Sequence, residues 1–286
     1  MIQPKPTDVP AIHDYNKLLD GRVAVVTGGG SRGIGGAIAT LFAAHGALVE
    51  IADIDAERAR ESADAIGQAG GQARAHVLDV TAPDQAARLA KLVLDHHGRC
   101  DVLVNNVGDY RPLVPFAKSG PESWEAMIRI NLLHFYAVTQ AFLGSMIARR
   151  RGSIVNVHSV EGMRGYPCEP VYGSLKAASA HFTTCLAAEQ GRNGIRVNGI
   201  GPDLTQTPQV DYISGFEEAS DLWPSWAPVG RLGWPEDQAR VALFLASDMS
   251  AYVTGHNIPV DGGTRAGSGW IWSPKENRFV NRPRHI

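Results

Sequence analysis

Short apolar runs alternate along this chain with longer stretches in which apolar residues recur at helical spacing. The runs are rich in Val, Ile, Leu and Ala and end at Gly, Asn, Asp or Ser, which is typical of strands buried on both faces of a parallel sheet. About seven strands are expected, at residues 22–27, 48–52, 73–78, 101–104, 152–157, 195–200 and 257–260. Helices are expected at residues 37–45, 54–69, 83–97, 121–149, 171–190 and 235–246. The pattern predicts one α/β domain, a Rossmann-like, doubly wound parallel sheet with helices on both faces.

A glycine-rich turn, residues 28–36, joins the first expected strand to its helix. It reads G-G-G-S-R-G-I-G-G, and the second strand ends in Asp53, 20 positions after Gly33. A strand, a glycine turn, a helix, a strand and an acid in this order form the dinucleotide-binding fingerprint. Glycines let the backbone approach a pyrophosphate, the helix N-terminus offers N–H groups to it, and Asp53 can accept hydrogen bonds from ribose hydroxyls. The turn therefore predicts a bound dinucleotide rather than a flexible linker.

Polar residues also follow other expected strands. In doubly wound sheets ligands bind at the carboxyl ends of the strands, so these residues are expected to ring one crevice. They are Asp53, Asp79, Asn105, Asn106, Ser159 and Pro202. A helix-capping role competes for most of them taken singly, and for Asp79 a contact to adenine and a cap both stay open.

Tyr172 and Lys176 lie four residues apart on an expected helix, so their side chains share one face. A nearby cation favours phenolate and lowers the pKa of a tyrosine from about 10 toward neutrality. The spacing alone occurs by chance on many helices. Together with the glycine turn it indicates a proton-exchanging pair beside a dinucleotide.

Composition narrows the class of function. The 286 residues, 44% of them hydrophobic, suffice for one domain with a full core, and a net charge of −2 gives no basic field for a nucleic acid partner. No apolar run of about 18–20 residues is evident and the N-terminus lacks the layout of a signal peptide, so no membrane partner is expected. Cys100, Cys168 and Cys185 are an odd number at wide spacing, which predicts neither a disulfide nor a metal site. A cytoplasmic location is the default.

Over residues 20–263 the chain resembles the short-chain dehydrogenase/reductase family. Ser159 lies 13 residues before Tyr172, and Asn131 lies 28 residues before Ser159, as in that family. The signatures that carry the resemblance are Gly29-x-x-x-Gly33-x-Gly35, Asn105-Asn106-Val107-Gly108, Asn131, Ser159, Tyr172-x-x-x-Lys176 and the late segment 244–263. The resemblance implies an NAD(P)-dependent oxidoreductase that interconverts an alcohol and a carbonyl, commonly as a homotetramer or homodimer.

The resemblance also implies roles for four catalytic residues. Ser159 would donate a hydrogen bond to the reacting oxygen, and Tyr172 would exchange a proton with it. Lys176 would hold the nicotinamide ribose and bias Tyr172 toward phenolate, while Asn131 would disturb its helix and help hold water that links Lys176 to solvent. The predicted cofactor-binding residues are Gly29, Ser31, Arg32, Gly33, Ile34, Gly35, Asp53, Asp79, Val80, Asn106, Gly108, Tyr172, Lys176, Pro202, Thr205 and Thr207.

Four positions depart from the family pattern. Residues 27–28 precede Gly33 with one residue more than the family's turn, so either Gly29 takes the role of the first glycine or the turn bulges. His158 replaces a small hydroxyl residue before the predicted catalytic serine and is either a packing residue or a group that tunes the site. Val107 replaces an alanine, and Asp203 stands where glycine is usual.

The choice of cofactor depends on Asp53. A carboxylate at the end of the second strand binds ribose hydroxyls and repels a 2′-phosphate. Arg32 in the glycine turn argues for NADP, because a basic residue there can accept that phosphate. Since the strand-end acid is expected to lie closer to the 2′ group, NAD is expected in preference to NADP.

Substrate selection is expected between residues 208 and 230, the stretch that forms a lid in the family. Its aromatic residues suggest an apolar pocket for a lipophilic cyclic alcohol or ketone of steroid, terpenoid or aryl type, although ordinary packing of the lid explains them equally well. The predicted substrate-binding residues are Ser159, Tyr172, Tyr110, Met163, Tyr212, Phe216 and Trp223. Two alternatives stay open: an NADPH-dependent carbonyl or 3-oxoacyl reductase, and a non-catalytic dinucleotide-binding sensor.

The two ends of the chain are expected to lie outside the catalytic domain, which is placed at residues 21–263. Residues 1–20 have several prolines and no clear period, so they are expected to form an arm on the surface. Residues 264–286 form a C-terminal extension that carries Trp270, Trp272 and Phe279. Exposed aromatic side chains tend to be buried somewhere, so a contact between subunits is expected there.

Overall fold

The computed structural model describes residues 10–30, 32–166, 169–214, 225–267, 269 and 271–280. Five residues of the sequence analysis lie outside the described residues: Ser31, Cys168, Phe216, Trp223 and Trp270. The expectations for them stay predictions.

A seven-stranded parallel sheet forms the centre of the molecule, and this confirms the predicted fold class. Its strands are β1 (Val23–Thr27), β2 (Leu48–Asp53), β3 (Gln72–Val77), β4 (Val102–Asn105), β5 (Gly152–Val157), β6 (Ile195–Pro202) and β7 (Asn257–Val260). The order across the sheet is β3-β2-β1-β4-β5-β6-β7. The order reverses between β1 and β4, so the loops that follow these two strands open a crevice at the carboxyl edge.

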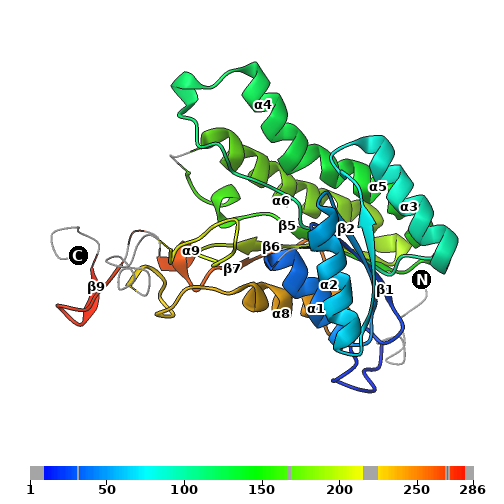
Figure 1. Ribbon diagram of the computed structural model, residues 1–286. Helices are drawn as coiled ribbons and strands as arrows, with labels where there is room; N and C mark the ends of the chain where they lie inside the picture. The colour runs from blue at the N-terminus through cyan, green and yellow to red at the C-terminus, as the bar shows by residue number, and fades with distance from the viewer. Residues whose placement is uncertain are drawn as a thin grey trace.

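Helices cover both faces of the sheet (Figure 1). On one face lie α1 (Ile34–Ala44), α2 (Ala56–Gln68) and α8 (Pro235–Ala246). On the other lie α3 (Pro83–His97), α5 (His134–Arg149) and α6 (Pro170–Gln190), with α4 (Pro121–Ile128) packed on α6. Each face has its own core, with Phe42 fully buried in the first and Phe142 in the second. β1, β4 and β5 are buried along their whole length, which is why their sequences are apolar rather than alternating.

The helices α4 and α5 form one continuous helical stretch through a π-helical turn, Arg129–Leu133. The stretch Pro121–Arg149 has 29 residues and a mean hydropathy of 1.2 in its most apolar window, which is enough by length and composition to cross a membrane. No stretch of this length and hydropathy was expected from the sequence. Val138 and Phe142 are fully buried against the sheet, and Phe135 is fully buried as well, an arrangement that core helices also show.

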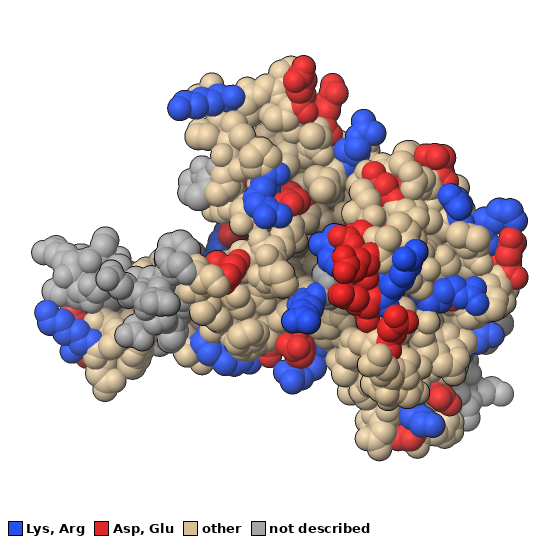
Figure 2. Space-filling view, in the orientation of Figure 1, with Lys and Arg blue, Asp and Glu red and all other residues tan. Residues whose placement is uncertain are grey.

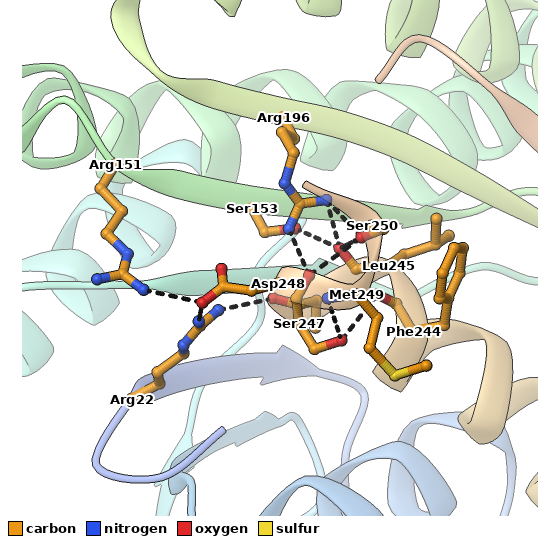
Figure 3. Close-up of polar contacts among 11 residues, drawn as sticks. Arg22, Arg151, Ser153, Arg196, Phe244, Leu245, Ser247, Asp248, Met249 and Ser250 are labelled. Carbon is orange, nitrogen blue, oxygen red and sulfur yellow. Dashed lines mark hydrogen bonds and ion pairs between the residues drawn. The ribbon is translucent and has the colours of Figure 1, made fainter. Parts of the chain in front are cut away.

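The amino edge of the sheet carries a network of arginines (Figure 3). Asp248, in a 3₁₀ turn after α8, pairs with Arg22, which precedes β1, and with Arg151, which precedes β5, at 3.4 Å. Arg196 on β6 donates to the carbonyl oxygens of Leu245 at 2.8 Å and Ser247 at 3.0 Å. The end of α8 is therefore fastened to three strands at the edge opposite the crevice.

The N-terminal segment packs into the domain core, whereas the C-terminal segment projects from the domain. Leu19 is fully buried in the first core, so the N-terminal segment is anchored there rather than lying wholly on the surface. After the short helix α9 (Thr264–Gly267), the strands β8 (Ile271–Ser273) and β9 (Arg278–Val280) pair as an antiparallel hairpin. The hairpin projects from the body at the C-terminal end, shown red in Figure 1, and the sequence analysis did not predict it.

Asp101 supplies a test of how the sheet is stabilised. Its carboxylate is 7% exposed and accepts from Val23 N at 2.9 Å, Arg99 Nε at 3.0 Å and Arg149 Nη1 at 2.7 Å. Burial raises the pKa of Asp101, but the hydrogen bonds from Arg149 and Val23 outweigh burial and leave the pKa lowered. We expect Asp101→Asn to reduce the free energy of unfolding by about 2 kcal/mol at pH 7, because two arginines lose their partner.

Because the folded pKa of Asp101 is lowered, the stabilisation is fully present above the unfolded value of 3.8 and is lost as pH falls toward the folded value. Urea denaturation at pH 7 and at about pH 3 should show the difference in unfolding free energy between wild type and Asp101→Asn narrowing at the lower pH, which lies below the unfolded pKa. Asp64→Asn on the exposed face of α2 is the control and should leave stability unchanged. An equal gap at both pH values would contradict the assignment.

Candidate active site

The glycine turn after β1 is shaped by close backbone contacts. Gly28 has a φ of +64°, and a Cβ on Gly35 would lie 2.3 Å from the carbonyl oxygen of Gly28. Thr27 Oγ1 accepts from Asn106 N at 3.0 Å, and Asn106 Nδ2 donates to the carbonyl oxygens of Thr27 at 3.1 Å and Gly28 at 3.3 Å. Since residues 27–28 are tied to the end of β4 and Gly33 is the N-cap of α1, the additional residue lies between them. Both alternatives, Gly29 in the role of the first glycine and a bulged turn, stay predictions.

The N-terminus of α1 faces this turn and suits an anionic group. Its N-cap, Gly33, offers no side-chain cap, and the first turn of α1 contains no acidic residue. Ile34, the first helical residue, is half-buried and Arg32 is exposed. Backbone N–H groups and the positive end of the helix dipole are thus available at the start of α1.

Asp53 ends β2 with its carboxylate directed at the glycine turn. Oδ2 accepts from Gly30 N at 3.1 Å, and Oδ1 accepts from Asp55 N at 3.0 Å and from Arg58 Nη2 at 3.4 Å. The Asp53 side chain is 6% exposed and that of Arg58 52%. Arg58, one turn into α2, was not among the predicted site residues, because nothing in its sequence context separates it from a solvated helix residue.

Asp79 and Val80 follow β3. Asp79 Oδ1 accepts from Thr81 N at 2.9 Å and from Thr81 Oγ1 at 2.7 Å. The carboxylate thus closes the turn that leads into α3, while Val80 is buried. The N-cap of α3 is Ala82, so Asp79 stabilises the turn before the helix and does not cap the helix itself, and its contact to adenine stays a prediction.

The structure brings three predicted catalytic residues together at the carboxyl edge. Ser159 follows β5 and caps the 3₁₀ turn Val160–Gly162, where its Oγ accepts from Glu161 N at 3.1 Å. This turn packs directly on α6, because a Cβ on Gly162 would lie 2.5 Å from the backbone of Lys176. The Nζ of Lys176 lies 5.5 Å from the centroid of the Tyr172 ring.

Asn131 lies in the π-helical turn and is fully buried. Its Nδ2 donates to Asp109 O at 2.7 Å, and its Oδ1 accepts from Asp109 N at 3.2 Å. A Cβ on Gly108 would lie 2.7 Å from Lys176 Nζ and 3.1 Å from Asn131 Oδ1. Only a glycine leaves room at position 108 for these two groups. Asn131 therefore joins the helix to the loop after β4 beside the buried amine.

The loop after β6 carries the last predicted cofactor residues. Pro202 ends β6, and Thr205 and Thr207 are both buried. Thr205 Oγ1 accepts from Gln238 Nε2 at 3.0 Å, and Thr207 Oγ1 accepts from Val210 N at 2.9 Å. Both hydroxyls thus support the fold of the loop itself.

Aromatic rings surround the phenol of Tyr172. Tyr110 lies 6.2 Å and Tyr166 6.0 Å from its ring, each edge to face. Tyr212 is half-buried, and burial raises the pKa of its phenol, with the carboxylate of Asp203 adding to the rise. Met163 lies apart from them, beside the end of β6, where its Cε would contact a Cβ on Gly201 at 3.5 Å. Tyr166 was missed by the sequence analysis, although its place between Ser159 and Tyr172 was a signal.

Comparison with known proteins agrees with this arrangement. The family model described as enoyl-(acyl carrier protein) reductase matches residues 29–265. The 3-oxoacyl-[acyl-carrier-protein] reductase FabG of Thermotoga maritima is 40% identical over 245 residues, which cover 86% of this chain and 98% of that protein. The chain belongs to the short-chain dehydrogenase/reductase family.

Two solved structures of other dehydrogenases are similar to this one. A 7α-hydroxysteroid dehydrogenase complexed with NADH and 7-oxo glycochenodeoxycholic acid has a TM-score of 0.81 and 34% identity, covering 88% of this chain and 98% of its own. A gluconate 5-dehydrogenase from Burkholderia cenocepacia in complex with NADP and tartrate gives the same four values. As a member of the short-chain dehydrogenase/reductase family, this chain is an oxidoreductase whose family binds nicotinamide dinucleotides.

Burial sets the charge states of the central pair. It raises the pKa of Tyr172 far above its usual 10; the Ser159 hydroxyl opposes the rise, whereas Glu161 adds to it. Burial also lowers the pKa of Lys176 to about 8. The expectation that Lys176 lowers the pKa of Tyr172 is therefore wrong for the protein alone, because desolvation of the phenolate outweighs the neighbouring amine.

Two buried histidines flank the site. His158 packs over β6, where a Cβ on Gly199 would lie 2.7 Å from its ring, and burial lowers its pKa to about 4. A packing role fits this placement. His134, three residues after Asn131, was not predicted; burial and the charge of Lys176 lower its pKa to about 3. Across the described part of the chain, no three His, Cys, Asp or Glu residues are arranged to hold a metal ion.

The buried amine leads to a prediction about stability. The folded pKa of Lys176 is about 8 and its ordinary value is 10.5, so below pH 8 the folded protein bears the full cost of burying an ammonium. We expect Lys176→Met to raise the free energy of unfolding by roughly 2 kcal/mol at pH 7 while abolishing activity.

Between pH 8 and 10.5 the unfolded chain binds one more proton than the folded chain, so wild-type stability rises there with pH. The advantage of Lys176→Met in thermal or urea unfolding should therefore shrink over this range. Lys91→Met is the matched control, since that side chain is 74% exposed. A destabilised Lys176→Met protein at pH 7 would contradict the prediction.

Proposed function

We propose that this oxidoreductase transfers a hydride between NAD and a secondary alcohol or ketone, with a lipophilic cyclic compound as substrate. The observation that carries the proposal is the convergence of Ser159, Tyr172, Lys176 and Asn131 at the edge where Asp53 faces the glycine turn. The four polar groups form one cluster in which Asn131, Ser159 and Lys176 are buried and Tyr172 is half-buried. This argues against a non-catalytic sensor, because such groups are costly to bury without a role.

The residues at the crevice fit a nicotinamide dinucleotide. The pyrophosphate would lie at the start of α1, where a Cβ on Gly35 would fill the close approach to Gly28. The adenosine ribose would lie against Asp53, and the nicotinamide ribose against Lys176. When bound, the nicotinamide supplies the hydride in reduction and accepts it in oxidation.

The side chains around the reacting oxygen would handle its charge and its proton. The Ser159 hydroxyl donates a hydrogen bond to the oxygen as negative charge gathers there. The raised pKa of Tyr172 keeps the phenol protonated at neutral pH, which is the form that reduction requires. Lys176, with a pKa of about 8, holds an exchangeable proton one helical turn away. Oxidation needs phenolate instead, so we infer that it is favoured by alkaline conditions.

The charge next to the ribose supports NAD. Both carboxylate oxygens of Asp53 accept hydrogen bonds from backbone N–H groups, those of Gly30 and Asp55. The negative charge of the carboxylate would repel a 2′-phosphate placed beside it. Arg58 lies 3.4 Å from the same carboxylate and would favour a phosphate if Asp53 were neutral. Similar proteins bind either NADH or NADP, so the family alone does not decide.

The aromatic rings at the site support a bulky apolar substrate. Tyr110 and Tyr166 present ring edges to Tyr172, and such surfaces suit a cyclic ligand better than a polyol. Reduction of a 3-oxoacyl thioester is the second candidate, and the similarity to FabG proteins favours it. Docking of an acidic carrier protein is less well supported, because the nearby Arg111 and Arg164 are each paired with carboxylates.

Replacing Asp53 tests the cofactor proposal. Wild type should show a kcat/KM with NAD at least about tenfold above that with NADP, and Asp53→Asn should reverse or abolish this preference by removing the repulsion. Asp64→Asn, on the exposed face of α2, is the control and should keep the wild-type ratio. A wild-type protein with the higher kcat/KM for NADP would contradict the proposed preference for NAD.

A substrate panel tests the function itself. Cyclic and aryl ketones, acetoacetyl-CoA and a sugar ketone would be compared by cofactor absorbance in both directions. We expect the cyclic ketones to give the highest kcat/KM, and Tyr172→Phe to lose at least about a thousandfold while still binding NADH. Acetoacetyl-CoA as the best substrate would select the second candidate. Turnover that survives in Tyr172→Phe would refute the catalytic assignment.

A further inference from the structure

Arg164 lies between carboxylates from two separate loops at the active edge. Its Nη2 donates to Glu161 Oε1 at 2.6 Å and to Asp203 Oδ2 at 2.9 Å, and its Nε donates to Glu161 Oε2 at 3.2 Å. The side chains are 28% exposed for Arg164, 13% for Glu161 and 10% for Asp203. A forked, partly buried contact of this kind orients its partners more strictly than a solvated ion pair.

Asp203 extends the contact to a third segment. Its Oδ2 also accepts from Thr264 Oγ1 at 2.6 Å, at the start of α9, and its Oδ1 accepts from Leu204 N at 2.9 Å. Leu204 has a φ of +39°, a backbone conformation that costs energy outside glycine and persists only where neighbours hold it. We call Glu161, Arg164, Asp203 and Thr264 the Arg164 clamp.

Each end of the Arg164 clamp leads to a residue of the site. Glu161 N donates to Ser159 Oγ at 3.1 Å, so the carboxylate that Arg164 holds belongs to the turn that orients the serine. On the other side, Asp203 O accepts from Thr205 Oγ1 at 3.0 Å. The clamp thus spans from the turn after β5 to the loop after β6.

We propose that the Arg164 clamp positions Ser159 relative to the loop that carries Thr205, with Asp203 and Arg164 as positioning residues that do not touch substrate. This inference rests on the proposed function, since it assigns the clamp to the same site. Glycine is usual in the family where Asp203 stands, so the bridge between the two loops is a property of this chain. Both carboxylate partners neutralise Arg164, which leaves it structural rather than available to an anionic substrate.

The test compares Asp203→Asn and Arg164→Met with a matched ion pair elsewhere. Asp248 likewise joins separate segments through two arginines, but at the amino edge of the sheet (Figure 3), so Asp248→Asn is the control. We expect both clamp variants to lower kcat by about tenfold to a hundredfold, because small displacements of an oriented group cost this much, with a smaller change in the KM for cofactor. The double variant should lose no more than the worse single one.

Hydrogen exchange of the protein without cofactor provides a second readout. In either clamp variant, amides in residues 160–166 and 203–207 should both exchange faster, whereas Asp248→Asn should lower the melting temperature and leave both segments and kcat unchanged. Unchanged exchange in one of the two segments, or additive losses in the double variant, would overturn the clamp. If wild type turns over no substrate, the proposed function fails on its own, and exchange still decides whether the two loops are coupled.

Discussion

The ammonium group of Lys176 is the constraint around which the active edge is built. It is 3% exposed, and no ion pair to it is found within the described ranges of the chain. The surroundings are shaped to hold it there. Gly108 leaves space for Nζ, the π-helical turn brings Asn131 to the same point, and the turn after Ser159 packs on the backbone of α6. A helix that only covers a sheet needs none of these three features. Each of them costs folding free energy, which is typical of functional sites.

Burial also explains why the pair of Tyr172 and Lys176 behaves differently from the expectation drawn from spacing. Four residues on a helix determine which face two side chains share, but not how much water reaches them. Tyr110 and Tyr166 come from other segments and lie edge to face against the ring of Tyr172, and burial is the main cause that raises the pKa of its phenol. The pair is therefore a protonated phenol beside a weakly basic amine, a state suited to giving protons.

Local signals predicted most of the architecture and the centre of the site. The apolar runs specified all seven strands, and the glycine turn, Asp53, Ser159 and Lys176 were found because their roles depend on short, ordered spacings. Features made by distant segments were not predicted. The contact of Tyr166 with Tyr172 and the ion pair of Arg164 with Asp203 depend on how two loops fold over the edge of the sheet. Hydrophobic periodicity carries no information on such loop contacts. Asp79 shows a local contact instead, since its carboxylate accepts from Thr81, two residues further along the chain.

The arginine network stabilises the sheet at its amino edge, whereas the candidate active site lies at the opposite, carboxyl edge. Arg22, Arg151 and Arg196 fasten the end of α8 and the start of three strands without any residue of the crevice. Basic and acidic side chains are interspersed over most of the face shown in Figure 2, with a group of acidic side chains near its centre. Loops at the opposite edge can therefore be exchanged or lengthened while the frame stays intact. This arrangement makes the chain a suitable scaffold for grafting new specificities by recombination of those loops.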